Sequence, residues 1–211
     1  ATTAVAELVI GLMLSMAREI TRADREIRNG NWIKKELMGS ELKGKYLGII
    51  GLGNIGKRLG RLARALNMNI IGYDVIPIDD EFSKEVGLMK ADLGTLLSSA
   101  DYVSLHVPLL DSTHHMINAE KLKLMKNTAR IINTSRGGVI DEEALYNSLK
   151  EGNIAGAALD VFEVEPATGN RLTTLPNFIA TPHMGAQTKE AQLLAANIIA
   201  EKIIQVLRGV L

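Results

Sequence analysis

Three side chains that follow apolar segments have types that together suit one reaction. Arg136 lies in NTSRGG, Glu165 in LDVFEVEP and His183 in TPH. An arginine guanidinium matches the two oxygens of a carboxylate or a 2-oxo acid. A histidine titrates near neutral pH and can move a proton, and a nearby glutamate would stabilise its imidazolium form. Taken alone, a histidine between a proline and a glycine is more often an ordinary loop residue, so the surrounding elements decide the interpretation.

A glycine-rich stretch, GIIGLGNIG, predicts a dinucleotide site. Gly51, Gly53 and Gly56 have G-x-G-x-x-G spacing, which is weak by itself because glycines often mark ordinary turns. Here an apolar segment precedes the pattern and an amphipathic one follows it. The first glycine permits a tight turn, the second lets a pyrophosphate approach the backbone, and the third lets helix and strand pack closely. Amides near Asn54 and Ile55 would then face the phosphates.

An aspartate at the end of the next apolar segment indicates which dinucleotide is bound. Asp74 lies 18 residues after Gly56. A carboxylate there can accept hydrogen bonds from both hydroxyls of the adenine ribose, and it would repel a 2′-phosphate. No arginine follows closely to hold such a phosphate. The sequence therefore favours NAD over NADP, and a solvated aspartate at a strand end is the alternative.

The elements that must position these residues follow an alternating pattern. Apolar runs on both faces that alternate with helices predict an α/β fold, a Rossmann-like doubly wound parallel sheet with helices on both faces. Ligands gather at the carboxyl ends of such strands, so Arg136, Asp160, Glu165 and His183 could reach one cleft. The expected strands are 45–51, 69–74, 102–108, 129–135, 154–162 and 178–182, and the expected helices are 54–67, 92–100, 119–126 and 141–151, the last with Asp141 as N-cap and Gly152 as stop.

Two further helices are expected at the ends of a single domain that covers residues 1–211, around a Rossmann core of about 44–184. The first, a long crossover helix of about 2–28, is apolar but too short and too charged to be a membrane span, which needs roughly 20 apolar residues. No positive charge precedes it, as a signal peptide would require. The second, about 188–208, has an apolar stripe of Leu193, Ala196, Ala200, Ile203 and Leu207.

Composition excludes several classes of function. Lys plus Arg and Asp plus Glu both number 24 and aromatic residues make up 4 %, so neither a basic stripe nor a base-stacking surface indicates nucleic acid. The absence of cysteine excludes disulfides, thiol nucleophiles and Cys-rich zinc sites, and we expect a cytoplasmic protein. The adjacent His114 and His115 cannot form an i, i+4 metal pair, so we expect loop residues and no metal. His106 is expected to be a packed side chain.

Six stretches, in order, resemble the NAD-binding domain of the D-isomer-specific 2-hydroxyacid dehydrogenases, most closely those that act on phosphoglycerate. The stretches are VAELVIGLML, GKYLGIIGLGNIG, SLHVPLLDSTHHMIN, INTSRGGVIDEEAL, GAALDVFEVEP and TPHMGAQTKEAQ. The resemblance implies that Arg136, Glu165 and His183 are the catalytic residues. It also implies that NAD is held by Gly51, Gly53, Asn54, Ile55, Gly56, Asp74, Val107, Thr134, Ser135, Arg136, Asp160, Gly185 and Ala186.

The same resemblance implies an activity and partners. It implies NAD-dependent oxidation of a D-2-hydroxy acid, foremost 3-phospho-D-glycerate to 3-phosphooxypyruvate in L-serine biosynthesis. Hydroxypyruvate or glyoxylate reduction is the near alternative, and an NAD-sensing corepressor-like binding protein is another. Formate dehydrogenase is weaker, because that relative pairs its histidine with Gln rather than with a residue like Glu165. The family's substrate-binding domain is absent from this chain. A homodimer or higher homo-oligomer is expected, with Trp32 as an interface anchor.

Overall fold

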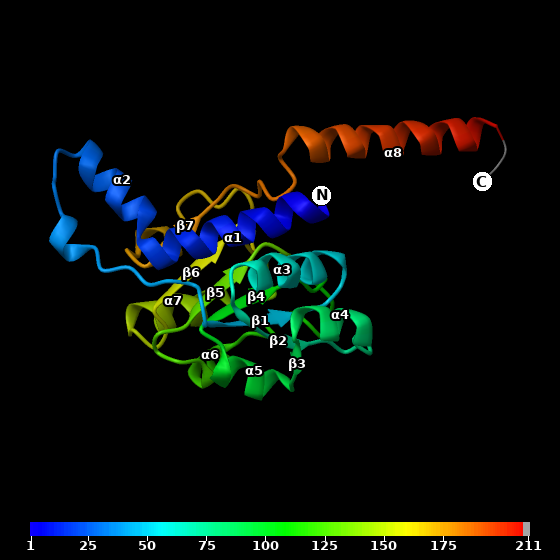
Figure 1. The fold of residues 1–211 in the computed structure, drawn as a ribbon. Coiled ribbons are helices and arrows are strands. Elements are labelled where there is room, and N and C mark those ends of the chain that lie inside the picture. Colours follow the sequence, from blue (N-terminus) through cyan, green and yellow to red (C-terminus); the bar gives the residue numbers. More distant parts are fainter. Residues whose placement is uncertain (209–211) are drawn as a thin grey trace.

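The computed structural model describes residues 1–208, and its centre is a fully parallel sheet (Figure 1). Within those residues seven strands follow the order β3-β2-β1-β4-β5-β6-β7. This order confirms the Rossmann-like prediction, with a seventh strand added at one edge. The strands are β1 (Tyr46–Ile50), β2 (Asn69–Tyr73), β3 (Met89–Lys90), β4 (Tyr102–Leu105), β5 (Arg130–Asn133), β6 (Gly156–Leu159) and β7 (Phe178–Ala180).

Helices cover both faces of this sheet, as predicted. One buried cluster joins α1 and α3 to one face, and a second joins α5, α6 and α7 to the other. The helices are α1 (Thr2–Arg18), α2 (Ile20–Arg28), α3 (Asn54–Ala65), α4 (Asp80–Val86), α5 (Leu93–Ser99), α6 (Ala119–Leu124), α7 (Glu142–Lys150) and α8 (Lys189–Leu207), with 3₁₀ turns at Lys34–Glu36 and Arg171–Thr174.

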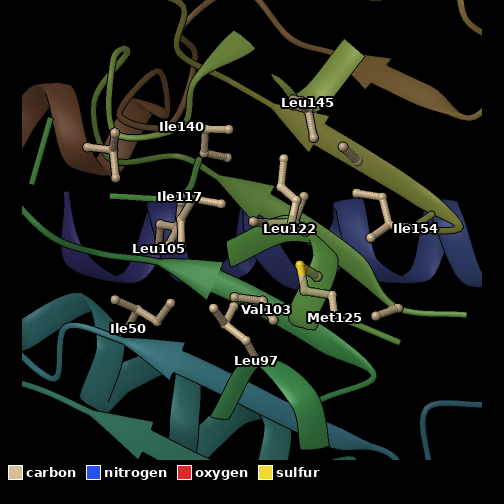
Figure 2. Close-up of a cluster of buried hydrophobic side chains, with 14 of the residues drawn as sticks. Ile50, Leu97, Val103, Leu105, Ile117, Leu122, Met125, Ile140, Leu145 and Ile154 are labelled. Atoms are coloured by element: carbon tan, nitrogen blue, oxygen red, sulfur yellow. The ribbon is translucent and has the colours of Figure 1, made fainter. Parts of the chain in front are cut away.

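The core explains why the strand segments are continuously apolar. Every residue of β4 and of β6 is buried, because helices lie on both sides of the central strands. Figure 2 shows one of the two clusters, in which Val103 and Leu105 of β4 lie near Ile117, Leu122 and side chains of neighbouring elements. Burying each such side chain fully contributes about 1.5–3 kcal/mol. The rigid sheet that results fixes where the strand ends lie.

The predicted crossover helix of about 2–28 is wrong in one respect, because it is two helices. Glu19 adopts a left-handed conformation with φ 51°, and its amide bonds to the carbonyl of Ser15. The face of α1 that is buried against the domain ends at Ala17, whereas α2 buries no residue. Continuing α1 straight would therefore gain no burial beyond Ala17. Trp32, which follows α2, is 80 % exposed.

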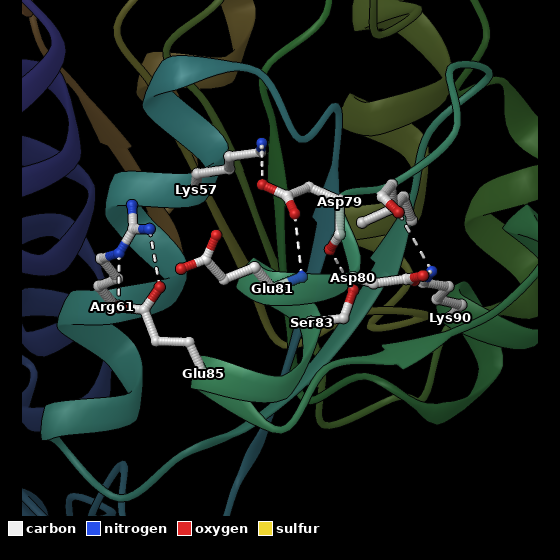
Figure 3. Close-up of polar contacts among 9 residues, drawn as sticks. Lys57, Arg61, Asp79, Asp80, Glu81, Ser83, Glu85 and Lys90 are labelled. Atoms are coloured by element: carbon white, nitrogen blue, oxygen red, sulfur yellow. Dashed lines mark hydrogen bonds and ion pairs between the residues drawn. The ribbon is translucent and has the colours of Figure 1, made fainter.

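Two elements that the periodicity did not predict are α4, which packs on α3, and β3, which pairs with β2. Ion pairs join α4 to α3 (Figure 3) beside an apolar contact, because Phe82 and Val86 of α4 share a buried cluster with residues of α3. Arg61 donates two hydrogen bonds to Glu85 at 2.7 Å, and Lys57 lies 3.2 Å from Asp79. Asp79 also caps α4 by accepting from the amide of Glu81. Helix α4 buries only Phe82 and Val86, and β3 buries neither of its residues, so neither element carries a clear hydrophobic period.

The C-terminal helix begins after its Thr188 cap, close to the predicted boundary, but its apolar stripe is not buried. Figure 1 shows α8 running away from the sheet and its covering helices. Ala191 alone among the residues of α8 is buried, and Leu193 is 64 % exposed. The stripe that the sequence predicted is therefore exposed rather than packed on the described part of this domain. The last three residues of the predicted domain, 209–211, lie outside the described residues. No helix within residues 1–208 combines the length and the apolar character needed to cross a bilayer.

Candidate active site

The glycine turn, residues 51–56, joins β1 to α3 at the carboxyl edge of the sheet, and each of its glycines has a different structural reason. Gly51 has φ 92°, and an added Cβ would lie 2.5 Å from the carbonyl oxygen of His106. An added Cβ on Gly56 would overlap the carbonyl of Gly51, whereas one on Gly53 would meet no protein atom within 4 Å. The predicted roles of a tight turn and close helix packing therefore fit Gly51 and Gly56. The open space at Gly53 fits the approach of a pyrophosphate.

The start of α3 offers free amides beside that space. Gly53 is its N-cap and makes no side-chain capping bond, and Asn54 and Ile55 form the first turn. The first amides of a helix have no partner within the helix and attract anions. The chain therefore presents the donor groups that a dinucleotide diphosphate needs.

Asp74 lies at the end of β2 and is already tied to the glycine turn. Its carboxylate accepts from the amide of Leu52 at 2.6 Å and from the amide of Ile76 at 3.0 Å. These bonds hold the carboxylate beside the turn while leaving lone pairs for ribose hydroxyls. A shallow hollow continues past it, lined by Val75, Ile76 and Pro77. The position is the one that the ribose role predicted from sequence requires.

The ends of β4 and β5 form the next part of the edge. His106 bonds through Nε2 to the Ser104 hydroxyl at 2.9 Å, and burial lowers its pKa from 6.5 to about 4, which confirms the packed histidine. Val107 follows directly and contacts Gly51. The hydroxyl of Thr134 is buried and, among the described residues, has no hydrogen-bond partner. Because buried hydroxyls usually have partners, this atom fits a position that a ligand completes.

Asp160, at the end of β6, is buried and organises the turn that carries His183. Its carboxylate accepts from the Thr181 hydroxyl at 2.5 Å and from the amides of Met184 and Gly185, each at 2.9 Å. These three bonds fix the TPHMG segment after β7 and leave His183 with φ 53°. The structure therefore gives Asp160 a positioning role that the sequence did not predict, next to its predicted contact with the cofactor.

The predicted acid–base pair is formed in the structure. His183 Nδ1 lies 2.8 Å from Glu165 Oε2, and the other carboxylate oxygen accepts from the amide of Phe162 at 3.1 Å. The hydrogen bond from His183 is the main reason that the pKa of Glu165 is lowered from its ordinary value, and the Phe162 amide adds to it. An ionised carboxylate only accepts, so Nδ1 carries the proton and Nε2 of the neutral ring is the free base. Both side chains line a cleft of about 570 Å³ with Thr181.

Arg136 is positioned separately, on the turn after β5. Asn133 holds that turn by donating to the carbonyl of Arg136 at 2.9 Å and by accepting from the amide and hydroxyl of Ser135. Within residues 1–208 the guanidinium bonds only to its neighbour's carbonyl, at 2.6 Å, and is otherwise exposed. Arg136 is not among the residues that line the cleft of Glu165 and His183. The structure thus brings two of the three predicted catalytic residues into direct contact and places the third on an adjacent turn.

The glycine turn, the free amides at the start of α3 and the Asp74 carboxylate lie in a stretch of the chain that matches a known family. Residues 10–185 match the family model described as D-isomer specific 2-hydroxyacid dehydrogenase, NAD binding domain. This chain belongs to that family. As its NAD-binding domain, the chain has NAD as its cofactor, and the open space at Gly53 and the unpaired Thr134 hydroxyl fit that molecule.

Relatives within the family carry several names. The chain is 52 % identical over 206 residues to a D-3-phosphoglycerate dehydrogenase of Methanocaldococcus jannaschii, covering 97 % of this chain and 39 % of that protein. It is 48 % identical over 204 residues to a hydroxypyruvate reductase of Thermotoga maritima, covering 95 % and 65 %. The chain thus spans less than two thirds of either relative. A D-lactate dehydrogenase of Aquifex aeolicus, in a crystal structure with NAD and lactic acid, has a TM-score of 0.91 at 31 % identity, covering 100 % of this chain and 68 % of that one.

The sequence did not predict the structural roles of several residues in this site. Asn133 and the anchoring role of Asp160 are seen only from hydrogen bonds. Gly137 is a third case, because an added Cβ would overlap the carbonyl of Phe162 in the next loop. The signal was present in part, since Asn133 and Gly137 both lie in NTSRGG, but nothing in that stretch indicates which neighbour approaches it.

Proposed function

We propose that this chain is the NAD-binding domain of a dehydrogenase for D-2-hydroxy acids and carries its catalytic residues. We further propose that 3-phospho-D-glycerate is the substrate. The observation that carries the proposal is the 2.8 Å contact of His183 Nδ1 with Glu165, at the same sheet edge as the glycine turn. The relative at 52 % identity, named as a D-3-phosphoglycerate dehydrogenase, supports the substrate.

In this proposal each residue of the chain has one task. Arg136 binds the substrate carboxylate, because its guanidinium is exposed and free of acidic partners among the described residues. Nε2 of His183 takes the hydroxyl proton as the carbonyl forms, and Glu165 stabilises the imidazolium that results. The hydride leaves the substrate carbon that bears this hydroxyl, and NAD supplies its acceptor. In the reverse direction His183 returns the proton to the carbonyl oxygen.

Hydroxypyruvate reduction is the second candidate, favoured by the relative at 48 % identity that carries this name. The two reactions use the same acid–base pair and differ in whether the substrate bears a phosphate. A homo-oligomeric state with Trp32 at the interface, and a cytoplasmic location, stay predictions.

The first experiment is a calorimetric titration of the 211-residue chain with NADH and then with NADPH. Saturable NADH binding with NADPH at least tenfold weaker is expected, because Asp74 opposes a 2′-phosphate. The Asp74→Asn variant keeps an acceptor for the Leu52 amide and removes the charge. It should therefore narrow the difference between the affinities for NADH and NADPH. A folded chain that binds neither nucleotide would contradict the proposal.

Substrate choice is tested by NADH oxidation with 3-phosphooxypyruvate, hydroxypyruvate and glyoxylate. If the chain is encoded within a longer protein, the assay uses that protein. The proposal expects the highest kcat/KM with 3-phosphooxypyruvate. Preference for hydroxypyruvate would support the second candidate, and turnover unchanged by His183→Asn would exclude the assigned base.

A further inference from the structure

Three side chains outside the cleft form a hydrogen-bonded group next to the loop that carries Glu165. His115 Nε2 lies 3.0 Å from Glu163 Oε1, and the same oxygen accepts from the amide of Glu142 at 3.2 Å. Glu142 Oε1 accepts in return from the amide of Glu163 at 2.7 Å. Each glutamate thus binds the other's backbone, and the histidine binds the shared oxygen. None of the three side chains lines the cleft itself.

These contacts join three loops that the sheet alone would leave independent. His115 follows β4, Glu142 begins α7, and Glu163 follows β6, two residues before Glu165. The α7 end is itself fixed, because its N-cap Asp141 accepts from the amide of Ala144. Glu142 also accepts from the Asn170 side chain at 2.7 Å, which adds an anchor on the far side.

The backbone before Glu163 and the histidine that contacts its side chain have little freedom. Gly137 packs so closely on the carbonyl of Phe162 that no Cβ fits between them. In the opposite loop, His115 holds a left-handed conformation with φ 48°, which costs a residue with a Cβ on the order of 1 kcal/mol. Its amide bonds to the carbonyl of Gly138 at 2.7 Å, so the strained residue is held from both its main chain and its side chain.

We propose that His115, Glu142 and Glu163 are positioning residues that form a clamp, which holds the 162–165 segment so that the Glu165 carboxylate meets Nδ1 of His183. The inference rests on the proposed function, in which that pair moves the proton. The Glu165 side chain is itself exposed and makes two hydrogen bonds among the described residues, so its direction depends on its backbone. The clamp supplies this constraint without touching the substrate.

The pKa of the Glu165 carboxyl reports on the clamp, because contact with His183 is the main cause of its lowering. It is measured by carboxyl ¹³C NMR titration of the 211-residue chain, with the Glu165 signal assigned as the one missing from Glu165→Gln. Glu163→Ala removes the acceptor for His115 and for the Glu142 amide. We expect it to lose most of the lowering, so that the pKa rises toward the ordinary value. Glu163→Gln keeps the accepting oxygen and should keep the lowering.

Two controls separate the clamp from a general loss of structure. Glu143→Ala changes the neighbouring residue of the same helix end and breaks an exposed ion pair with Arg171, but does not contact the 162–165 segment. It should leave the Glu165 pKa unchanged. His115→Ala removes the clamp contact from the opposite loop, so it provides the same test if Glu163→Ala fails to fold.

The outcomes distinguish this inference from the proposed function. His183→Asn removes the ring and tolerates the left-handed backbone, so it should raise the Glu165 pKa in full. If it does so while Glu163→Ala and His115→Ala leave the pKa lowered, the clamp is overturned and the acid–base pair stands. If His183→Asn has no effect, the pair is not formed and the proposed function fails first.

Discussion

The glycine turn and the proposed catalytic residues lie at one sheet edge but are built in opposite ways. The turn depends on main-chain atoms packed so closely that Gly51 and Gly56 leave no room for a Cβ. Arg136, Glu165 and His183 are exposed side chains on loops. Asn133 donates to the Arg136 carbonyl, Asp160 accepts from the Gly185 amide that follows His183, and the Glu165 carboxylate accepts from the Phe162 amide. Changes in the turn should therefore affect folding, whereas changes among the catalytic residues should affect chemistry with little effect on stability.

The largest effect is expected from Gly56→Ala. The added Cβ would overlap the Gly51 carbonyl, a backbone atom that cannot move without opening the turn. We expect a loss of about 3 kcal/mol in the free energy of unfolding, at the upper end for overpacking. Gly11→Ala, in the middle of α1, is the matched control. Its added Cβ would meet nothing within 4 Å, and alanine should raise the free energy of unfolding by about 0.5–1 kcal/mol. Urea unfolding of both variants measures the difference, and equal stabilities would refute the close-packing argument.

The second effect is a loss of stability at acidic pH, and it tests the burial of His106 beside the glycine turn. Its pKa is lowered from 6.5 to about 4, so the unfolded chain binds a proton at a higher pH than the folded chain does. Stability should therefore fall as the pH drops from about 6.5 toward 4, by on the order of 2 kcal/mol. His106→Gln should flatten this part of the curve, while the exposed His114→Gln should not. Unfolding midpoints across this range measure it, and an unchanged slope in His106→Gln would contradict the assignment.

A smaller effect separates folding from binding within the turn. Gly53→Ala adds a Cβ that meets no protein atom, at φ −70°, which alanine adopts freely. Stability should stay within about 0.5 kcal/mol of the parent. NADH affinity should fall about tenfold, which corresponds to about 1.4 kcal/mol, because the pyrophosphate needs that space. Calorimetry with NADH decides between this result and an unchanged Kd, which would place the diphosphate elsewhere.

A similarly small effect on stability is expected at the pair of Glu165 and His183. Glu165→Gln removes the charge from a partly exposed hydrogen bond with His183 and should cost about 0.5 kcal/mol at neutral pH. Because the folded pKa of Glu165 is lowered, its contribution is present above the unfolded value and disappears as the pH falls through the folded value. The variant should therefore lose its small deficit in acid, below about pH 4. Turnover should nevertheless fall about a hundredfold or more, since a general base loses its partner. A variant that keeps full turnover would remove Glu165 from the mechanism.

Local patterns were sufficient for the elements whose signals lie close together in the sequence. The six predicted strands, the Asp141 cap and the Thr188 start of the last helix are confirmed, because apolar runs and capping residues act within a few positions. The glycine spacing likewise predicted the turn, since each glycine answers a local steric need. The contact of His183 with Glu165 followed from the family resemblance rather than from any periodicity.

The error at Glu19 and the exposure of the α8 stripe share a physical origin in packing partners that the sequence does not specify. The helix break at Glu19 occurs where the face buried by the domain ends, and the stripe of α8 meets no part of residues 1–188 that would bury it. A hydrophobic pattern states that a face can be buried, but not what covers it.

The sequence by itself determined six of the seven strands within residues 1–208, the helices other than α2 and α4, the glycine turn and the types of side chain at the strand ends. Period and spacing are local properties, and each of these features depends on neighbours within a few residues. The tertiary structure alone decided that Asp160 anchors the His183 turn, that Gly137 packs on Phe162, and that Glu163 reaches both His115 and Glu142. These contacts join residues separated by 20 or more positions. They form only after the parallel sheet has brought its strand ends to one edge.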